Sequence, residues 1–163
     1  MSERIAILGI GNLLMSDDGI GVHAAQTLAT NSPAGVDVVD AGTDFLSALP
    51  FLESADRALI IDAVQAGGTP GTIYRLTEEE INARHTVAPA HATNLLAARG
   101  LLPPGAKWPE ILILGIEPAE LDYGLELSPL VAAALPRVVA QAREITAMWR
   151  ESTGTRSIEF SLI

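Results

Sequence analysis

The sequence contains no cysteine and only half as many basic as acidic residues. Without cysteine, the chain can form no disulfide and no thiolate zinc site, and it has no cysteine nucleophile. Its 10 Lys and Arg residues stand against 20 Asp and Glu residues, which gives a formal charge of −10. No basic cluster is present that could follow a phosphate backbone, so we expect no nucleic-acid partner.

The sequence also lacks a long uninterrupted apolar run. The first such run is broken by Gly9, Gly11 and Asn12, and it is too short for a signal peptide or a membrane span. We therefore expect a monomeric cytoplasmic protein with no membrane insertion. A length of 163 residues, 48% of them hydrophobic, suits one domain with a sizeable core. We place this α/β domain at residues 1–150 and a C-terminal tail at residues 151–163.

Apolar runs alternate with helical patterns along the chain, which is typical of a layered α/β fold. Residues 72–76 are expected to form a further strand after a turn cluster at residues 67–71. The connection from the strand at 58–63 is too short for a crossover helix, so we expect residues 72–76 to run antiparallel beside that strand, at an edge of the sheet. The predicted fold has three layers, α/β/α, with a mostly parallel sheet of about five strands and helices on both faces. Parallel strands are predicted at residues 5–10, 36–39, 58–63 and 111–116, and helices at 19–30, 44–53, 91–99 and 128–150.

The loop after the first predicted strand carries two glycines and then two adjacent aspartates, Asp17 and Asp18. Backbone N–H groups at a helix start attract phosphate, but this carboxylate pair would repel it. Leu14 also stands where a dinucleotide-binding loop has its third glycine. The loop therefore favours a cation over a phosphate.

Acidic residues follow the ends of all the predicted parallel strands. In an open α/β sheet the carboxyl ends of the strands share one edge, where ligands bind. We therefore expect these side chains to gather at that edge. They are Asp17, Asp18, Asp40, Asp62 and Glu117.

His91 opens the helix predicted at residues 91–99. A helix N-terminus disfavours the imidazolium ion, so His91 is expected to be neutral near pH 7, the form that binds metal. A neutral imidazole with two carboxylates is a three-ligand set of nitrogen and oxygen atoms. Such a set suits Zn, Ni, Mn or Fe without choosing among them.

Several of these residues also have a structural interpretation. One of Asp17 and Asp18 could cap the following helix, and Asp40 lies where a ribose-binding carboxylate would sit. His91 could be a satisfied core or capping residue, and Glu117 is expected at the rim rather than among the ligands. Asp62, by contrast, lies within an apolar run, where an isolated carboxylate is costly, so a functional role is favoured.

Five short segments and one histidine stand in order over about residues 5–145. They are Gly-Ile-Gly-Asn-Leu-Leu-Met-Ser-Asp-Asp at residues 9–18, Asp-Ala-Gly-Thr at 40–43, Ile-Ile-Asp-Ala at 60–63, His91, Gly-Ile-Glu-Pro at 115–118 and Gly-Leu-Glu-Leu-Ser-Pro at 124–129. Together they resemble the nickel-iron hydrogenase maturation endopeptidases. The resemblance implies an aspartyl-type endopeptidase that removes the C-terminal extension of the hydrogenase large-subunit precursor, with inserted nickel as its recognition signal.

The resemblance also implies roles for single residues. The family's metal ligands correspond to Asp18, Asp62 and His91, of which the two aspartates are also the expected catalytic residues. Some relatives have glutamate at the position of Asp18, which leaves Asp17 as a possible substitute. Nickel is expected to arrive with the substrate, and zinc or cadmium could occupy the site as a surrogate. The segment that resembles a substrate-contact loop contains Asp40, Gly42 and Thr43.

Two other functions remain open from the residues alone. The first is a nickel-binding escort that has the same fold but does not hydrolyse its partner. The second is a nucleotide-binding module that would use Gly9, Gly11 and Asp40. Metal binding without cleavage would favour the escort, and stabilisation by nucleotide would favour the module.

Overall fold

The apolar runs of the sequence form the centre of a six-stranded sheet. The structure is a computed structural model that describes the backbone of residues 2–161 and the side chains of residues 2–153. Its strands are β1 (Ile5–Ile10), β2 (Val36–Gly42), β3 (Arg57–Gln65), β4 (Ile73–Thr77), β5 (Ala88–Pro89) and β6 (Glu110–Ile116). Its helices are α1 (Ile20–Ala29), α2 (Phe45–Ser54), α3 (Glu78–Ala83), α4 (Ala92–Ala97) and α5 (Pro129–Ser161), with 3-10 turns η1 (Ser16–Gly19) and η2 (Ala98–Leu101).

The strands lie in the order β2-β1-β3-β6-β4, and β5 pairs with the end of β3. β1, β2, β3 and β6 are parallel, and β4 is an antiparallel edge strand, as predicted. The neighbour predicted for β4 was wrong, because β4 pairs with β6 and not with β3. β6 is largely buried, and its place between β3 and β4 covers both of its hydrogen-bonding edges.

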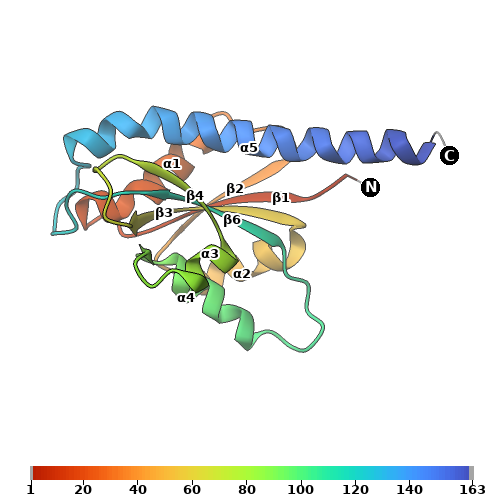
Figure 1. Cartoon of the computed structure of the whole chain (residues 1–163), viewed down its shortest axis with the longest axis horizontal. Helices are drawn as coiled ribbons and strands as arrows, with labels where there is room; N and C mark the ends of the chain where they lie inside the picture. The colour runs from red at the N-terminus through yellow and green to blue at the C-terminus, as the bar shows by residue number, and fades with distance from the viewer. Residues whose placement is uncertain (1, 162–163) are drawn as a thin grey trace.

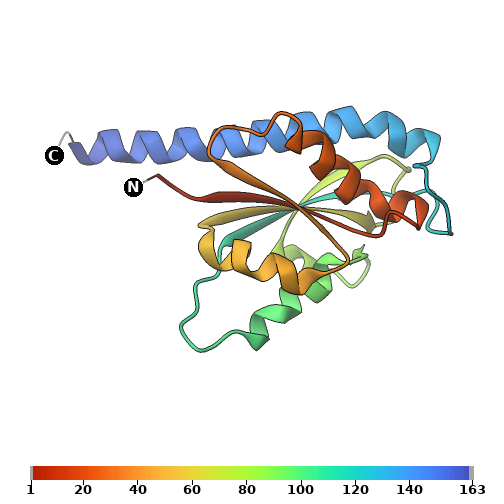
Figure 2. The same ribbon diagram turned by 180° about the vertical axis from the view of Figure 1, so that it is seen from behind.

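Helices cover both faces of the sheet, which confirms the predicted three-layer fold. In Figure 1, α1 and α5 lie on one side of the strands, and α2, α3 and α4 lie on the other. Figure 2 shows the same two layers from behind. Two separate apolar clusters fill the spaces between the sheet and these layers. The carboxyl ends of β1 and β3 are thereby held in a rigid frame.

Gly9, in β1, and Gly11, directly after β1, allow α1 and η1 to approach the backbone of this strand closely. A Cβ atom on Gly9 would lie 2.1 Å from the carbonyl oxygen of Gly21, and one on Gly11 would lie 2.0 Å from that of Asp18. The Gly11 N–H donates to the carbonyl of Gly42 at 2.9 Å. These glycines therefore serve close backbone contact, and this geometry does not favour a phosphate cradle or the nucleotide-binding alternative.

α5 is longer than predicted. It continues to Ser161, whereas the sequence pattern placed its end near residue 150. Arg150 donates to the carbonyl of Ala34, and the Arg57 guanidinium lies 5.6 Å from the centre of the Trp149 ring, so the helix is still anchored near that point. Residues 162 and 163 of the expected tail lie outside the described chain, and the domain division at residue 150 stays a prediction.

No helix within the described residues is both long enough and apolar enough to cross a membrane.

Candidate functional site

The topology brings Asp18, Asp62 and His91 together at the carboxyl edge of the sheet. Asp18 lies in η1, directly after β1 and its glycine loop. Asp62 lies near the end of β3, the central neighbour of β1. His91 is the N-cap residue of α4, which follows β5 at the end of β3. Two of the acids expected at this edge, Asp18 and Asp62, thus lie next to His91.

Asp62 is fully buried, and its two carboxylate oxygens differ in their hydrogen bonds. Its Oδ2 accepts the backbone N–H groups of His91 and Ala92, each at 2.8 Å, and so satisfies two free donors at the start of α4. Its Oδ1 has no hydrogen-bond partner among the described residues. Burial raises the pKa of Asp62 to about 6, because desolvation outweighs the two hydrogen bonds that favour the carboxylate.

His91 and Asp18 are in direct contact. The His91 Nε2 lies 2.7 Å from Asp18 Oδ2, and the same oxygen accepts the Asn12 N–H at 3.0 Å. The hydrogen bond to Asp18 raises the pKa of His91. The contact with Asp18 therefore acts against the effect that we expected from the helix N-terminus, and a neutral His91 near pH 7 stays a prediction.

Among the described residues, no three His, Asp or Glu side chains are arranged to hold a metal ion. Asp18 and His91 instead satisfy each other through their hydrogen bond. The donor types still fit a metal such as nickel, because an imidazole nitrogen and two carboxylates meet here. The Oδ1 of Asp62 is a further buried acceptor without a partner among the described residues, on a carboxylate whose Oδ2 binds the His91 N–H. The assignment of the three residues as metal ligands stays a prediction.

Asp17 is a structural carboxylate and does not share the role of Asp18. It is fully buried and accepts four hydrogen bonds, from the N–H groups of Ala119, Glu120 and Ser128 and from the Ser128 hydroxyl, at 2.7 to 2.9 Å. Its Oδ2 accepts three of these bonds and its Oδ1 accepts the fourth, so this carboxylate is committed to holding the chain around Ser128. Neither Asp17 nor Asp18 caps α1, whose N-cap residue is Gly19.

The predicted substrate-contact loop lies beside His91. Gly42 and Thr43 line a small pocket of about 70 Å³ together with His91. Asp40 does not line this pocket. Its carboxylate accepts the Gly42 N–H and the Gln26 side-chain amide, both at 3.1 Å, so it shapes the turn that presents Gly42. The prediction that these residues contact substrate is not tested by this geometry.

Glu117 is a buried structural residue, which corrects its expected place at the rim. Only 5% of it is exposed, and its carboxylate accepts the Ala66 N–H at 2.8 Å. It thereby ties the end of β6 to the chain that leaves β3. Of the five acids expected at this edge, Asp17 and Glu117 support the scaffold, and Asp18 and Asp62 adjoin His91.

Sequence analysis did not single out three residues that adjoin the site. Phe45 and Asn94 line the pocket with His91, and the Asn12 backbone holds Asp18. Asn12 directly follows Gly11 in the first loop, and this position could have indicated that its backbone lies close to the site. Phe45 and Asn94 follow the predicted segments by only two or three residues, but nothing in their spacing distinguished them from ordinary helix residues.

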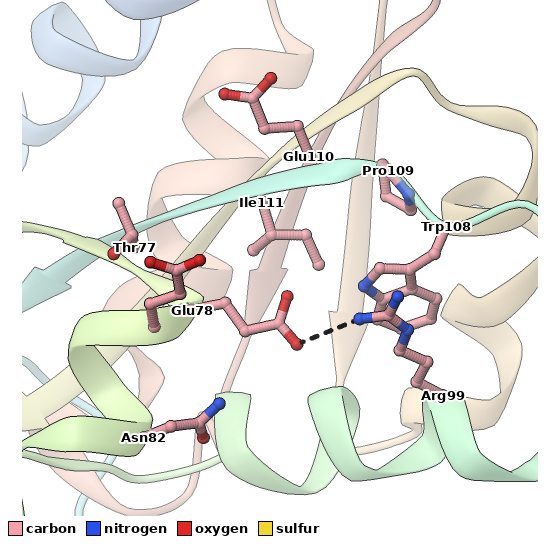
Figure 3. Close-up of a pocket in the computed structure, with 9 residues that line it drawn as sticks. Thr77, Glu78, Asn82, Arg99, Trp108, Pro109, Glu110 and Ile111 are labelled. Atoms are coloured by element: carbon pink, nitrogen blue, oxygen red, sulfur yellow. Dashed lines mark ion pairs between the residues drawn. The ribbon is translucent and has the colours of Figure 1, made fainter.

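A second hollow, of about 630 Å³, lies at the opposite edge of the sheet. Figure 3 shows Arg99 between the Trp108 ring and Glu78, with which it forms an ion pair at 3.9 Å. The hollow is bounded by the start of β6 and the end of β4, far from the carboxyl ends of the parallel strands. None of the predicted site residues lines it.

Comparison with known proteins finds relatives from one family. A family model described as hydrogenase maturation protease matches residues 22–145. The hydrogenase expression/formation protein HupD of Rhodobacter capsulatus is 34% identical over 99% of this chain and 80% of its own length. The hydrogenase 2 maturation protease of Escherichia coli is 34% identical over 86% of this chain and 92% of its own length.

Solved structures give the same result. The nickel-iron hydrogenase maturation protease HybD from Thermococcus kodakarensis superposes with a TM-score of 0.77 at 32% identity, covering 87% of this chain and 98% of its own. HybD from Escherichia coli superposes with a TM-score of 0.72 at 29% identity, covering 91% of this chain and 93% of its own. The chain therefore belongs to the hydrogenase maturation protease family.

Proposed function

We propose that this protein is the endopeptidase that removes the C-terminal extension of a nickel-loaded hydrogenase large-subunit precursor, with the nickel as its recognition signal. Family membership supports the endopeptidase activity and the hydrogenase precursor as substrate. The observation that supports the nickel part is the contact between His91 and Asp18, together with the unpaired Oδ1 of Asp62, whose Oδ2 binds the His91 backbone N–H. These atoms are the donors that a divalent metal carried by the substrate would meet.

Peptide hydrolysis adds water to the scissile carbonyl and transfers one proton to the departing amine. Of the two candidate general bases, we favour Asp62 over Asp40. The free Oδ1 of Asp62 and its pKa of about 6 suit proton transfer near neutral pH. Both carboxylate oxygens of Asp40 are already occupied by donors from the protein. The pocket beside Gly42 and Thr43 is proposed to receive the peptide next to the cleaved bond.

Intact-mass spectrometry of the nickel-loaded precursor tests this function. Wild-type protein is expected to release one C-terminal peptide, and Asp18→Asn and Asp62→Asn variants are expected to release none. Asp37→Asn is the matched control, because Asp37 is an exposed acid on β2 away from these residues. An unchanged precursor mass with the wild type would refute the endopeptidase assignment, and metal binding without cleavage would favour the escort. The cytoplasmic location and the monomeric state stay predictions.

A further inference from the structure

Two loops at the carboxyl edge form an exposed apolar surface beside Asp18. Residues 12–16 and residues 122–125 run side by side, joined by a parallel bridge between Met15 and Gly124. The Gly124 N–H donates to the Leu14 carbonyl at 2.9 Å, and the Ser16 N–H donates to the Gly124 carbonyl at 2.8 Å. The exposed apolar side chains on this pair are Leu14, Tyr123 and Leu125, at 50%, 76% and 65% exposure. We call these three side chains the loop-pair surface.

The loop-pair surface is held rigidly. The Asp17 carboxylate fixes the second loop through its bonds to Ala119, Glu120 and Ser128. The Ser16 hydroxyl donates to the Asp122 carbonyl at 2.8 Å, and a Cβ on Gly124 would lie 2.6 Å from that hydroxyl. Large apolar side chains that are fixed in solvent cost free energy without a partner, and rigid presentation lowers the entropy lost on binding.

Charge indicates the chemistry of the partner. The second loop carries the exposed acid Asp122, and the exposed acids Glu120 and Glu126 stand close to its two ends in the chain. The sequence has no Lys or Arg between Arg4 and Arg57 or between Lys107 and Arg137, so neither loop contributes a positive charge. A complementary partner therefore has an apolar patch with basic residues at its rim. A second copy of this chain would instead place like charges against each other.

We propose that the loop-pair surface docks the folded body of the hydrogenase large-subunit precursor, through an apolar patch rimmed by Lys and Arg on that precursor. The inference rests on the proposed function, since it takes the same substrate. The surface adjoins the site along the chain, because residue 16 pairs with the second loop and residue 18, two positions later in η1, contacts His91. A precursor seated on this surface would bring its metal and its C-terminal extension to Asp18 and His91.

The test measures binding and cleavage separately for the folded, nickel-loaded precursor. Tyr123→Ser and Leu125→Ser are each expected to raise the Kd by about tenfold in calorimetric titration, and to raise KM with little change in kcat. Leu101→Ser is the matched control, because Leu101 is 72% exposed in η2, outside the two loops. A Glu120→Gln, Glu126→Gln double variant is expected to weaken the salt dependence of binding.

Unchanged Kd values in both serine variants would overturn the docking proposal and would leave the proposed endopeptidase function unaffected. Binding without cleavage by the wild type would overturn the proposed function, and the docking surface would still be judged by the variants. Failure of the wild type to bind the precursor would overturn both. Dimerisation of the wild type that Leu125→Ser abolishes would assign this surface to a second copy of the chain and refute the docking proposal. Sedimentation velocity measures that outcome.

Discussion

The Oδ2 atom of Asp62 accepts the backbone N–H of Ala92 at 2.8 Å, so a carboxylate on β3 fixes the start of α4. The neighbouring N–H of His91 binds the same oxygen at the same distance. The main chain that carries the imidazole is therefore positioned by the Asp62 carboxylate. This connection links the charge state of Asp62 to the stability of the fold and to the proposed function.

Stability is expected to depend on pH through Asp62. Its pKa is about 6 in the folded protein, against an ordinary value of 3.8 for the unfolded chain, so the folded state binds this proton more tightly. The contribution to stability is present below about pH 4 and is lost as the pH rises to about 6, by on the order of 3 kcal/mol. Urea unfolding of wild type and Asp62→Asn across this range measures it. A constant difference between the two proteins would contradict the prediction.

Metal binding at the site is expected to strengthen as the pH rises through about 6. A proton on Asp62 competes with the metal, and the raised pKa of His91 acts in the same direction because a charged imidazole cannot be a ligand. Calorimetric titration of nickel or zinc below and above that pH measures the effect. Asp18→Asn should bind more weakly at both values, whereas Asp37→Asn should match the wild type. Equal affinity across the range would remove Asp62 from the ligand set.

Replacing Asp17 by Asn is expected to destabilise the fold by on the order of 3 kcal/mol. The amide removes the charge that strengthens four hydrogen bonds and turns a donor toward the donors of Ser128. Ser128→Ala removes only the hydroxyl bond and should cost about 1 to 2 kcal/mol. Chemical denaturation measures both. Equal losses in the two variants would show that the charge on Asp17 contributes little.

Gly9→Ala is expected to destabilise the protein by about 3 kcal/mol or more. The new Cβ would lie 2.1 Å from the Gly21 carbonyl oxygen and 2.5 Å from the Ala25 Cβ, and helix backbone cannot move aside easily. Gly100→Ala is the control, since a Cβ there meets nothing within 4 Å. Thermal unfolding of the two variants measures the difference. A normal melting temperature for Gly9→Ala would mean that α1 can shift away from β1.

The sequence was sufficient to predict the parallel strands and the convergence of Asp18, Asp62 and His91. Continuous apolar runs mark buried strands, and the acids stand at their ends, so the shared edge follows from sheet geometry. The pairing of β4 with β6 could not be predicted, because two antiparallel positions satisfy the same short connection. Only the placement of β6, residues 110 to 116, decides between them.

The different roles of Asp17 and Asp18 could also not be predicted from the sequence. Neighbouring side chains in the 3-10 turn η1 point in different directions, and adjacency in sequence does not say which one faces the site. The partner of Asp17 is Ser128, 111 residues away, and no local pattern reports such a contact. The contact that raises the pKa of His91 could not be predicted for the same reason, because Asp18 is 73 residues away in the chain.

The division of the Asp62 oxygens also has a dynamic consequence. Fraying of the first turn of α4 would release Oδ2 from the His91 and Ala92 amides and move the imidazole away from Asp18 in the same event. Helix opening and loss of the site are thus a single local unfolding step. Hydrogen exchange at these two amides would report how often the arrangement exists, even when no substrate is bound.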